Sequence, residues 1–106
     1  FQQAGDQKDA ASVITNIGLI YQETGNSEEA LNYHYQALTI DSTLGDIMGQ
    51  AGDLTNIGSV MEQKGEFTGA LEYYRRAAVL FEKANAQREA EFVRDNIRRV
   101  EKKIKG

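Results

Sequence analysis

The chain has 106 residues, the length of one domain, and a net charge of -4 that argues against non-specific binding to nucleic acid. It has no cysteine, which excludes a disulfide framework and a thiolate zinc site, and it has no apolar run long enough to span a membrane. Because a cysteine-free composition suits a reducing compartment, we expect a cytoplasmic location.

The first residues resemble the end of a helix. Phe1 is not a natural start residue, so we expect a fragment of a longer chain and interpret residues 1–4 as the tail of a missing upstream helix. Gly5 and Gly45 are each followed by an aspartate. Glycine suits the left-handed position after a helix, and Asp6 or Asp46 suits the N-cap of the next helix. Each Gly-Asp pair therefore predicts a turn between two helices.

Two helices are predicted after the first turn. Apolar residues recur at spacings of three and four from residue 7 to about residue 24, and Gly25 ends that helix. Asn26 starts a helix over 27–43, and Glu29 stands where it would complete a capping box. The expected apolar residues are Ala10, Val13, Ile14, Ile17, Ile20 and Tyr21 in the first helix, and Ala30, Leu31, His34, Ala37 and Leu38 in the second.

The same arrangement returns over 47–64 and 67–84, separated by Gly65. The residues expected to be buried are Ala51, Leu54, Ile57 and Met61 in the one helix, and Phe67, Ala70, Leu71, Tyr74, Ala77, Ala78 and Phe81 in the other. A fifth helix over 86–105 carries one narrow apolar stripe on a charged surface, formed by Ala90, Val93, Ile97, Val100 and Ile104. One apolar face and one solvated face are what a terminal capping helix of a solenoid needs.

The chain contains an internal repeat. The tetrapeptide Thr-Asn-Ile-Gly at residues 15–18 returns unchanged at residues 55–58, and a divergent copy stands at residues 95–98. The period is 40 residues, and residues 5–44 align with 45–84 with twelve identities. Such a period is typical of stacked helical repeats. We therefore divide one domain, 1–106, into repeat one (5–44), repeat two (45–84) and a C-terminal capping helix (85–106).

These units resemble the tetratricopeptide repeat, in which a large apolar residue, Leu-Gly and Tyr precede Ala, an aromatic residue and Ala. The matching residues are Ile14, Ile17, Gly18, Tyr21, Ala30, His34 and Ala37 in repeat one, and Leu54, Ile57, Gly58, Met61, Ala70, Tyr74 and Ala77 in repeat two. The histidine replaces an aromatic residue, and the proline that ends the standard unit is absent. Each unit is longer than the standard one, which resembles the long repeats of kinesin light chains and of spindle-orientation adaptors.

The resemblance implies an all-α fold, a right-handed α-solenoid of antiparallel helix pairs, with five helices in this chain. It also implies a protein-binding adaptor or scaffold that holds a partner on a concave face lined by the first helix of each unit. In related long-repeat adaptors, a ladder of asparagines grips the backbone of a bound peptide. Asn16, Asn56 and Asn96 occupy that register position here, and an amide offers both a donor and an acceptor.

No set of residues predicts an enzyme, a metal site or a cofactor site. A catalytic site needs convergent groups, and the single histidine, His34, stands at a core aromatic position where a packed histidine is the better interpretation. The acidic pairs Glu28-Glu29 and Glu89/Glu91 lie at helix N-termini, where negative charge interacts well with the helix dipole. We therefore expect no catalytic activity and no cofactor.

The leading hypothesis is a module that binds a peptide or protein segment in its groove. Residues 1–80 carry 4 basic and 11 acidic side chains, whereas residues 81–106 carry 8 basic and 5 acidic ones. The groove is therefore expected to become cationic at the fifth helix and to favour a partner with acidic residues near one end. The predicted peptide-binding residues are Asn16, Asn56, Asn96, Thr15, Thr55, Leu19, Ser59, Phe92, Arg99, Lys102 and Lys103.

Two other interpretations stay open at this point. In the first, the chain is a scaffold segment of a longer solenoid, and it associates with further copies through its ends, because the apolar residues of its first helix cover more than one face. In the second, it is a regulatory domain linked to an enzyme. The asparagines also have an alternative structural interpretation, in which each amide bonds a neighbouring helix or backbone. None of these interpretations involves nucleic acid or a membrane.

Overall fold

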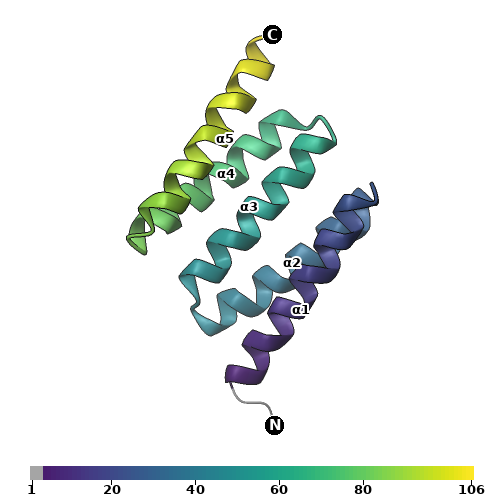
Figure 1. Cartoon of the computed structure of the whole chain (residues 1–106), viewed down its shortest axis with the longest axis vertical. Coiled ribbons are helices and arrows are strands. Elements are labelled where there is room, and N and C mark those ends of the chain that lie inside the picture. The colour runs from purple at the N-terminus through teal and green to yellow at the C-terminus, as the bar shows by residue number, and fades with distance from the viewer. Residues whose placement is uncertain (1–3) are drawn as a thin grey trace.

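Five helices form the chain in the computed structural model, which describes residues 4–106. They are α1 (Ala4–Glu23), α2 (Ser27–Leu44), α3 (Ile47–Gln63), α4 (Phe67–Lys83) and α5 (Gln87–Lys105), and no strand occurs in this range. Each helix packs on the next one in the chain, and α1 makes slight contact with α3 as well. Figure 1 shows the resulting row of antiparallel helices. The predicted five-helix, all-α solenoid is therefore confirmed.

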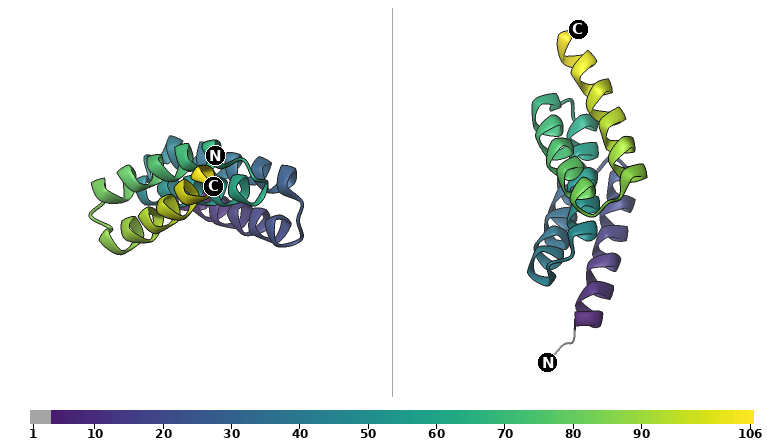
Figure 2. Two further views of the ribbon diagram at one scale, coloured as in Figure 1. Left: turned by 90° about the horizontal axis from the view of Figure 1, so that it is seen from above. Right: turned by 90° about the vertical axis from the view of Figure 1, so that its left-hand side faces the viewer.

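The helices lie at three levels across the molecule. In both views of Figure 2, α1 and α5 lie on one side of the molecule and α2 and α4 on the other, with α3 between them. The body measures 51 × 32 × 17 Å. Because α3 is flanked by α1 and α5, the first helices of the units border a common surface, of which α3 is the floor.

The turns between helices use residues with left-handed backbone. Gly25, Gly45 and Gly65 have φ values of 82°, 70° and 82°, and Asn85 takes the same position after α4 with φ 58°. This conformation lets the amides after each helix bond its last free carbonyls, as when the N–H of Asp46 donates to Asp41. The predicted helix ends therefore agree with the structure within a few residues.

One predicted cap forms and another does not. The side chain of Asp46 accepts a hydrogen bond of 2.9 Å from the backbone N–H of Gly49, as expected for an N-cap. Asn26 precedes α2, but its side-chain oxygen accepts no capping bond, and its amide nitrogen donates to the Thr24 hydroxyl. The predicted capping box of Asn26 and Glu29 is therefore wrong.

The predicted turn at Gly5 and Asp6 is also wrong. α1 begins at Ala4, so both residues lie inside that helix, and Ala4 belongs to α1 rather than to an upstream helix. Asp6 stands in the first turn of α1, where its charge interacts favourably with the helix dipole. The rest of the predicted tail, residues 1–3, lies outside the described residues.

The core follows the predicted apolar faces of α2 to α5, and α1 contributes less. Along α1, Ala11 and Gly18 are buried, whereas Val13 and Ile20 are 57% and 60% exposed. Ile104, predicted to be in the stripe of α5, is exposed because the end of α5 extends beyond α4 (Figure 1). The largest buried cluster consists of Ala51, Leu54, Ala70, Leu71, Tyr74, Ala77, Ala78, Phe81, Ala90, Val93 and Val100.

Candidate functional site

Three neighbouring cavities line the surface bordered by α1, α3 and α5. Their volumes are about 240, 420 and 370 Å³, and Asn56 on α3 lines all three. Gly52 and Phe92 each line two of them. We call this surface the central groove, and it is formed by Ser12, Thr15, Asn16, Gly52, Thr55, Asn56, Ser59, Phe92, Asn96 and Arg99.

The three register asparagines differ in their surroundings. Asn16 is exposed and Asn56 is half-buried, so both amides face the central groove. Asn96 is 7% exposed, and its Oδ1 already accepts a hydrogen bond of 2.9 Å from Arg99. The side-chain amides of Asn16 and Asn56 can therefore hydrogen-bond a ligand, whereas that of Asn96 holds Arg99 in position.

The hydroxyl residues of the predicted site are engaged within the protein. Thr15 donates to Asp53, Thr55 donates to the carbonyl of Ala51, and Ser59 accepts from the Gln22 amide. These bonds hold three small polar side chains in fixed positions along the groove. Of the other predicted residues, Leu19, Lys102 and Lys103 are exposed and line none of the three cavities.

Phe92 forms the apolar wall of the groove on α5. Its side chain is 61% exposed, although it borders two of the cavities. A fully exposed phenylalanine gains nothing from the hydrophobic effect, and covering it would remove apolar surface from water. This residue therefore suits contact with an apolar group of a ligand.

The cationic end of the groove is partly neutralised by Glu62. Arg99 binds its carboxylate through two nitrogens, at 2.8 and 2.7 Å, and Lys103 binds it at 2.9 Å. The Tyr74 hydroxyl donates to the same carboxylate at 2.9 Å. These partners, Arg99 first, lower the pKa of Glu62 to about 2. Two of the three cations predicted to meet an acidic ligand therefore already have an anionic partner.

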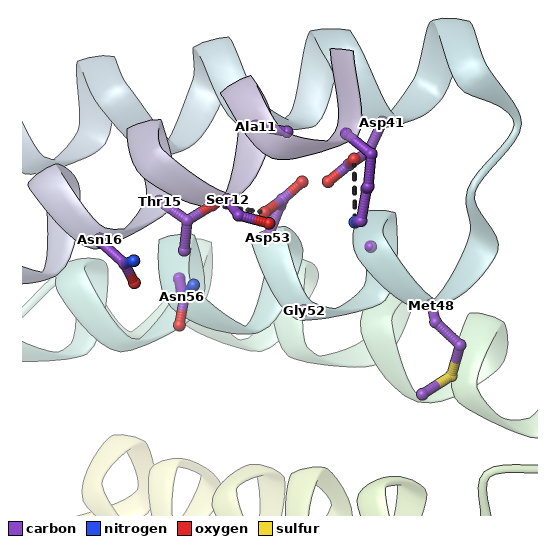
Figure 3. A pocket seen from close by; sticks show the side chains of 11 residues that line it. Ala11, Ser12, Thr15, Asn16, Asp41, Met48, Gly52, Asp53 and Asn56 are labelled. Carbon is purple, nitrogen blue, oxygen red and sulfur yellow. Dashed lines mark hydrogen bonds and ion pairs between the residues drawn. The ribbon is translucent and has the colours of Figure 1, made fainter. Parts of the chain in front are cut away.

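A second charged cluster lies at the other end of the groove, between α1, α2 and α3. The carboxylates of Asp41 and Asp53 are 2% and 3% exposed, and both line the smallest of the three cavities (Figure 3). The amine of Lys8 is 3.3 Å from Asp41 and 2.6 Å from Asp46. Burial, followed by the adjacent Asp41, raises the pKa of Asp53 to about 8. We call Asp41, Asp46, Asp53 and Lys8 the acidic cluster.

Sequence reasoning missed the acidic cluster, although the repeat register contained the signal. Asp41 aligns with Phe81 of repeat two, and Asp53 aligns with Val93 of the capping helix. Both of these counterparts are buried in the core. A carboxylate at a position that is apolar in the neighbouring unit indicates either a charged partner or a polar site.

His34 is a core residue, as expected. Its ring is fully buried under Gly18, and neither ring nitrogen has a hydrogen-bond partner. Burial lowers its pKa, because a charged imidazole would be poorly solvated there.

Within residues 4–106, no group of three or more His, Asp or Glu side chains is arranged to hold a metal ion. None of the helices in this range combines the length and apolar character needed to cross a bilayer.

Comparison with known proteins gives one match. A family model described as SNAP, soluble NSF attachment protein, matches residues 1–100. A search of curated proteins finds no match. The matched range covers both repeats and nearly all of α5, so it includes every residue of the central groove.

Proposed function

The chain belongs to the soluble NSF attachment protein family, and from that premise we propose that it holds a segment of a partner protein in its central groove. Members of this family are non-catalytic, helical-repeat adaptors that bind other proteins. The family name describes attachment to another protein, NSF. We extend the family's general property to this chain, and we assign the contact to α1, α3 and α5.

The observation that carries the proposal is the continuity of the three cavities at Asn56. A polypeptide needs an elongated site, and these cavities follow one another from the α1 side of α3 to the α5 side. The amides of Asn16 and Asn56 each offer a donor and an acceptor, which match the two polar groups of a peptide unit. Thr15, Thr55 and Ser59 line these cavities with small polar side chains.

The α5 side of the groove would favour an apolar residue followed by an acidic one. Phe92 presents an uncovered ring beside Asn56. Arg99, Lys102 and Lys103 lie further along α5, and together they exceed the single charge of Glu62. We therefore propose a preference for acidic ligand residues near the C-terminal end of α5, where Lys102 is exposed and, unlike Arg99 and Lys103, does not bind Glu62.

A peptide-library selection followed by binding measurements tests this proposal. Peptides selected on the wild-type chain are measured on Asn56→Ala and on Gly52→Leu, which places a side chain in the groove at a position where a Cβ meets no atom within 4 Å. We expect each variant to bind about tenfold more weakly, as for the loss of 1.4 kcal/mol. Lys102→Glu should remove acidic residues from the selected sequences.

A matched control separates the groove from the rest of the surface. Asn32 is an exposed asparagine on α2, on the side of the molecule opposite α1 and α5, so Asn32→Ala repeats the chemical change of Asn56→Ala away from the groove. It should bind the peptides like the wild type. Equal binding by wild type, Asn56→Ala and Gly52→Leu would contradict the proposal.

A second candidate function is self-association through the outer face of α1. Val13 and Ile20 are largely exposed there, whereas Asp53 and Val60, their counterparts in repeat two, are buried by the preceding unit. A second copy of the chain would cover this face as a neighbouring repeat does. Sedimentation should then show concentration-dependent association that Ile20→Lys abolishes. A strict monomer at about millimolar concentration would contradict this candidate.

We propose the division into repeats 5–44 and 45–84 and a capping helix 85–106, because each unit repeats the same helix pair. We also propose a long-repeat adaptor of the kinesin-light-chain type, because each unit spans 40 residues. We propose a cytoplasmic location because the chain has no cysteine, and no cofactor because no set of residues predicts a cofactor site. We propose no role in nucleic-acid binding, since the net charge of -4 is unfavourable for it.

A further inference from the structure

The acidic cluster occupies a place that the fold fills with apolar side chains elsewhere. At the junction of α4 and α5, the residues in register with Asp41 and Asp53 are Phe81 and Val93, which are 6% and 0% exposed. At the junction of α2 and α3 the same two positions carry carboxylates beside a cavity of about 240 Å³. The solenoid does not need charge at this junction in order to stack, so the carboxylates call for another explanation.

The cluster is incompletely satisfied. Oδ1 of Asp53 accepts a long hydrogen bond of 3.4 Å from Thr15, and Oδ2 is buried without a partner. The side chain is 97% buried, since its exposed fraction is 3%, and it faces the cavity (Figure 3). Asp53 offsets part of the cost of this burial by holding a proton, and a cation supplied from outside would replace that proton.

The cavity opens toward the groove residues Asn16 and Asn56, and small residues border it. Gly52 and Ala11 line it, and a Cβ added at Gly52 would meet no atom within 4 Å. A volume of about 240 Å³ exceeds the roughly 30 Å³ share of one water several times, which is enough for the end of a long side chain. A ligand lying along the two asparagines would therefore pass the mouth of this cavity.

We propose that this cavity binds the cationic end of a lysine or arginine side chain of the bound polypeptide, with Asp53 and Asp41 as its anionic partners. The assignment of the polypeptide rests on the proposed function, whereas the cation site itself does not. A guanidinium carries several N–H donors in one plane and suits two adjacent carboxylates. The bound segment would thus be basic near α1 and acidic near the end of α5.

Lys8 acts as an internal competitor for the same carboxylates. Its amine reaches Asp41 and Asp46, and its side chain is 45% exposed, so it can swing into solvent when another cation enters. Asp46 is also bonded to the Gly49 N–H and would stay in place. Removing the Lys8 charge should therefore strengthen binding of an external cation.

Binding should also depend on pH. The groups that face Asp53 are Lys8 and Thr15 from α1 and Asp41 from α2, and Asp46 at the start of α3 binds the same Lys8 amine. Because the pKa of Asp53 is raised to about 8, a cation bound near neutral pH must displace a proton. The affinity should therefore rise as the pH rises through that value.

The test uses small probes rather than a peptide. Butylguanidinium is titrated into the isotopically labelled chain, and the amide resonances of Thr15, Gly52 and Asp53 are followed by NMR. The neutral analogue butylurea serves as the matched probe. We expect saturable shifts with butylguanidinium, about tenfold weaker binding for Asp53→Asn, and tighter binding for Lys8→Gln. Asp9→Asn, an exposed acidic residue of α1, should bind like the wild type.

The outcomes separate this inference from the proposed function. Absence of saturable shifts in both the wild type and Lys8→Gln, or equal binding of butylurea, would overturn the cation site. Unchanged affinity in Asp53→Asn, with that variant folded by circular dichroism, would overturn it as well. A positive probe titration combined with failure to select any groove-binding peptide would contradict the proposed function but not the cation site.

Discussion

Gly18 lies against the imidazole of His34, so closely that a Cβ built on the glycine would be 2.8 Å from Cε1 of the ring. Gly58 stands in the same relation to Tyr74, also at 2.8 Å. The two glycines are one period apart, and each allows the first helix of a unit to approach the ring carried by the second. This contact fixes the spacing of the two helices within each unit.

Leucine at either glycine should destabilise the fold. Gly18→Leu and Gly58→Leu would each force a side chain against a buried ring, and overpacking costs about 1–3 kcal/mol or more. The free energy of unfolding is measured by urea denaturation. Gly52→Ala is the control, because that helical glycine faces open space and alanine is favoured there by up to about 1 kcal/mol. Equal stability of Gly18→Leu, Gly58→Leu and wild type would refute the packing role.

His34→Tyr should stabilise the chain. In repeat two the Tyr74 hydroxyl donates to Glu62, and the residue in register with Glu62 in repeat one is Gln22, whose Oε1 is buried without a partner. A tyrosine hydroxyl at position 34 would supply that donor, and one net hydrogen bond contributes about 1 kcal/mol. His34→Phe is the matched control, since it provides the ring without the hydroxyl. Thermal unfolding should rank tyrosine above phenylalanine, and the reverse order would contradict the account.

The ion pairs at Glu62 should limit binding of acidic peptides. Glu62→Gln releases Arg99 and Lys103 from their carboxylate partner, so peptides with acidic ends should bind more tightly. The fold should lose about 1–3 kcal/mol, because the side chain of Glu62 is only 11% exposed and makes charge-assisted bonds. Fluorescence titration measures the affinity, with Glu72→Gln on exposed surface as the control. Unchanged affinity for acidic peptides would show that Arg99 and Lys103 make no contact with them.

Asp53→Asn should change how stability depends on pH. The folded-state pKa of Asp53 is raised to about 8 from 3.8, so the folded chain holds a proton that the unfolded chain has lost between these values. The stabilisation that comes from the bound proton is complete below the pKa of Asp53 in the unfolded chain. It is lost as the pH rises through the pKa of Asp53 in the folded chain. The stability gained by Asp53→Asn relative to wild type should therefore grow from about pH 4 to about pH 9. A difference that does not vary with pH would contradict the buried protonated carboxyl.

The helices were predictable because the same start and end signals occur in both repeats. Turn glycines and apolar spacings recur after 40 residues, and Gly25, Gly45 and Gly65 adopt the left-handed conformation expected of them. Gly5 is also followed by an aspartate, but the turn predicted there is wrong. Gly45 adopts the left-handed conformation that ends a helix, whereas α1 runs from Ala4 through Gly5 and Asp6, so the Gly-Asp pair alone does not end a helix.

The groove was predictable in position but not in charge. Register placed Asn16 and Asn56 on its surface, whereas the engagement of Asn96 and Arg99 depends on Glu62, which lies 37 residues before Arg99 on a different helix. Such pairs form only after the helices stack, and a single sequence does not reveal which side chains reach one another. The ion pairs of the acidic cluster were missed for the same reason, since they join Lys8 on α1 to Asp41 on α2 and to Asp46 before α3. The register alone could have marked Asp41 and Asp53 as polar residues at core positions.

NMR mapping of a selected peptide on the labelled chain tests the central claim most directly. Binding along the central groove should shift the amide resonances of Asn16, Gly52, Asn56 and Phe92, which border its cavities. The resonances of Asn32, Thr39 and Glu72, exposed on α2 and α4, should stay unchanged. The largest shifts falling on those outer helices, or around Val13 and Ile20, would contradict the assignment of the central groove as the binding site.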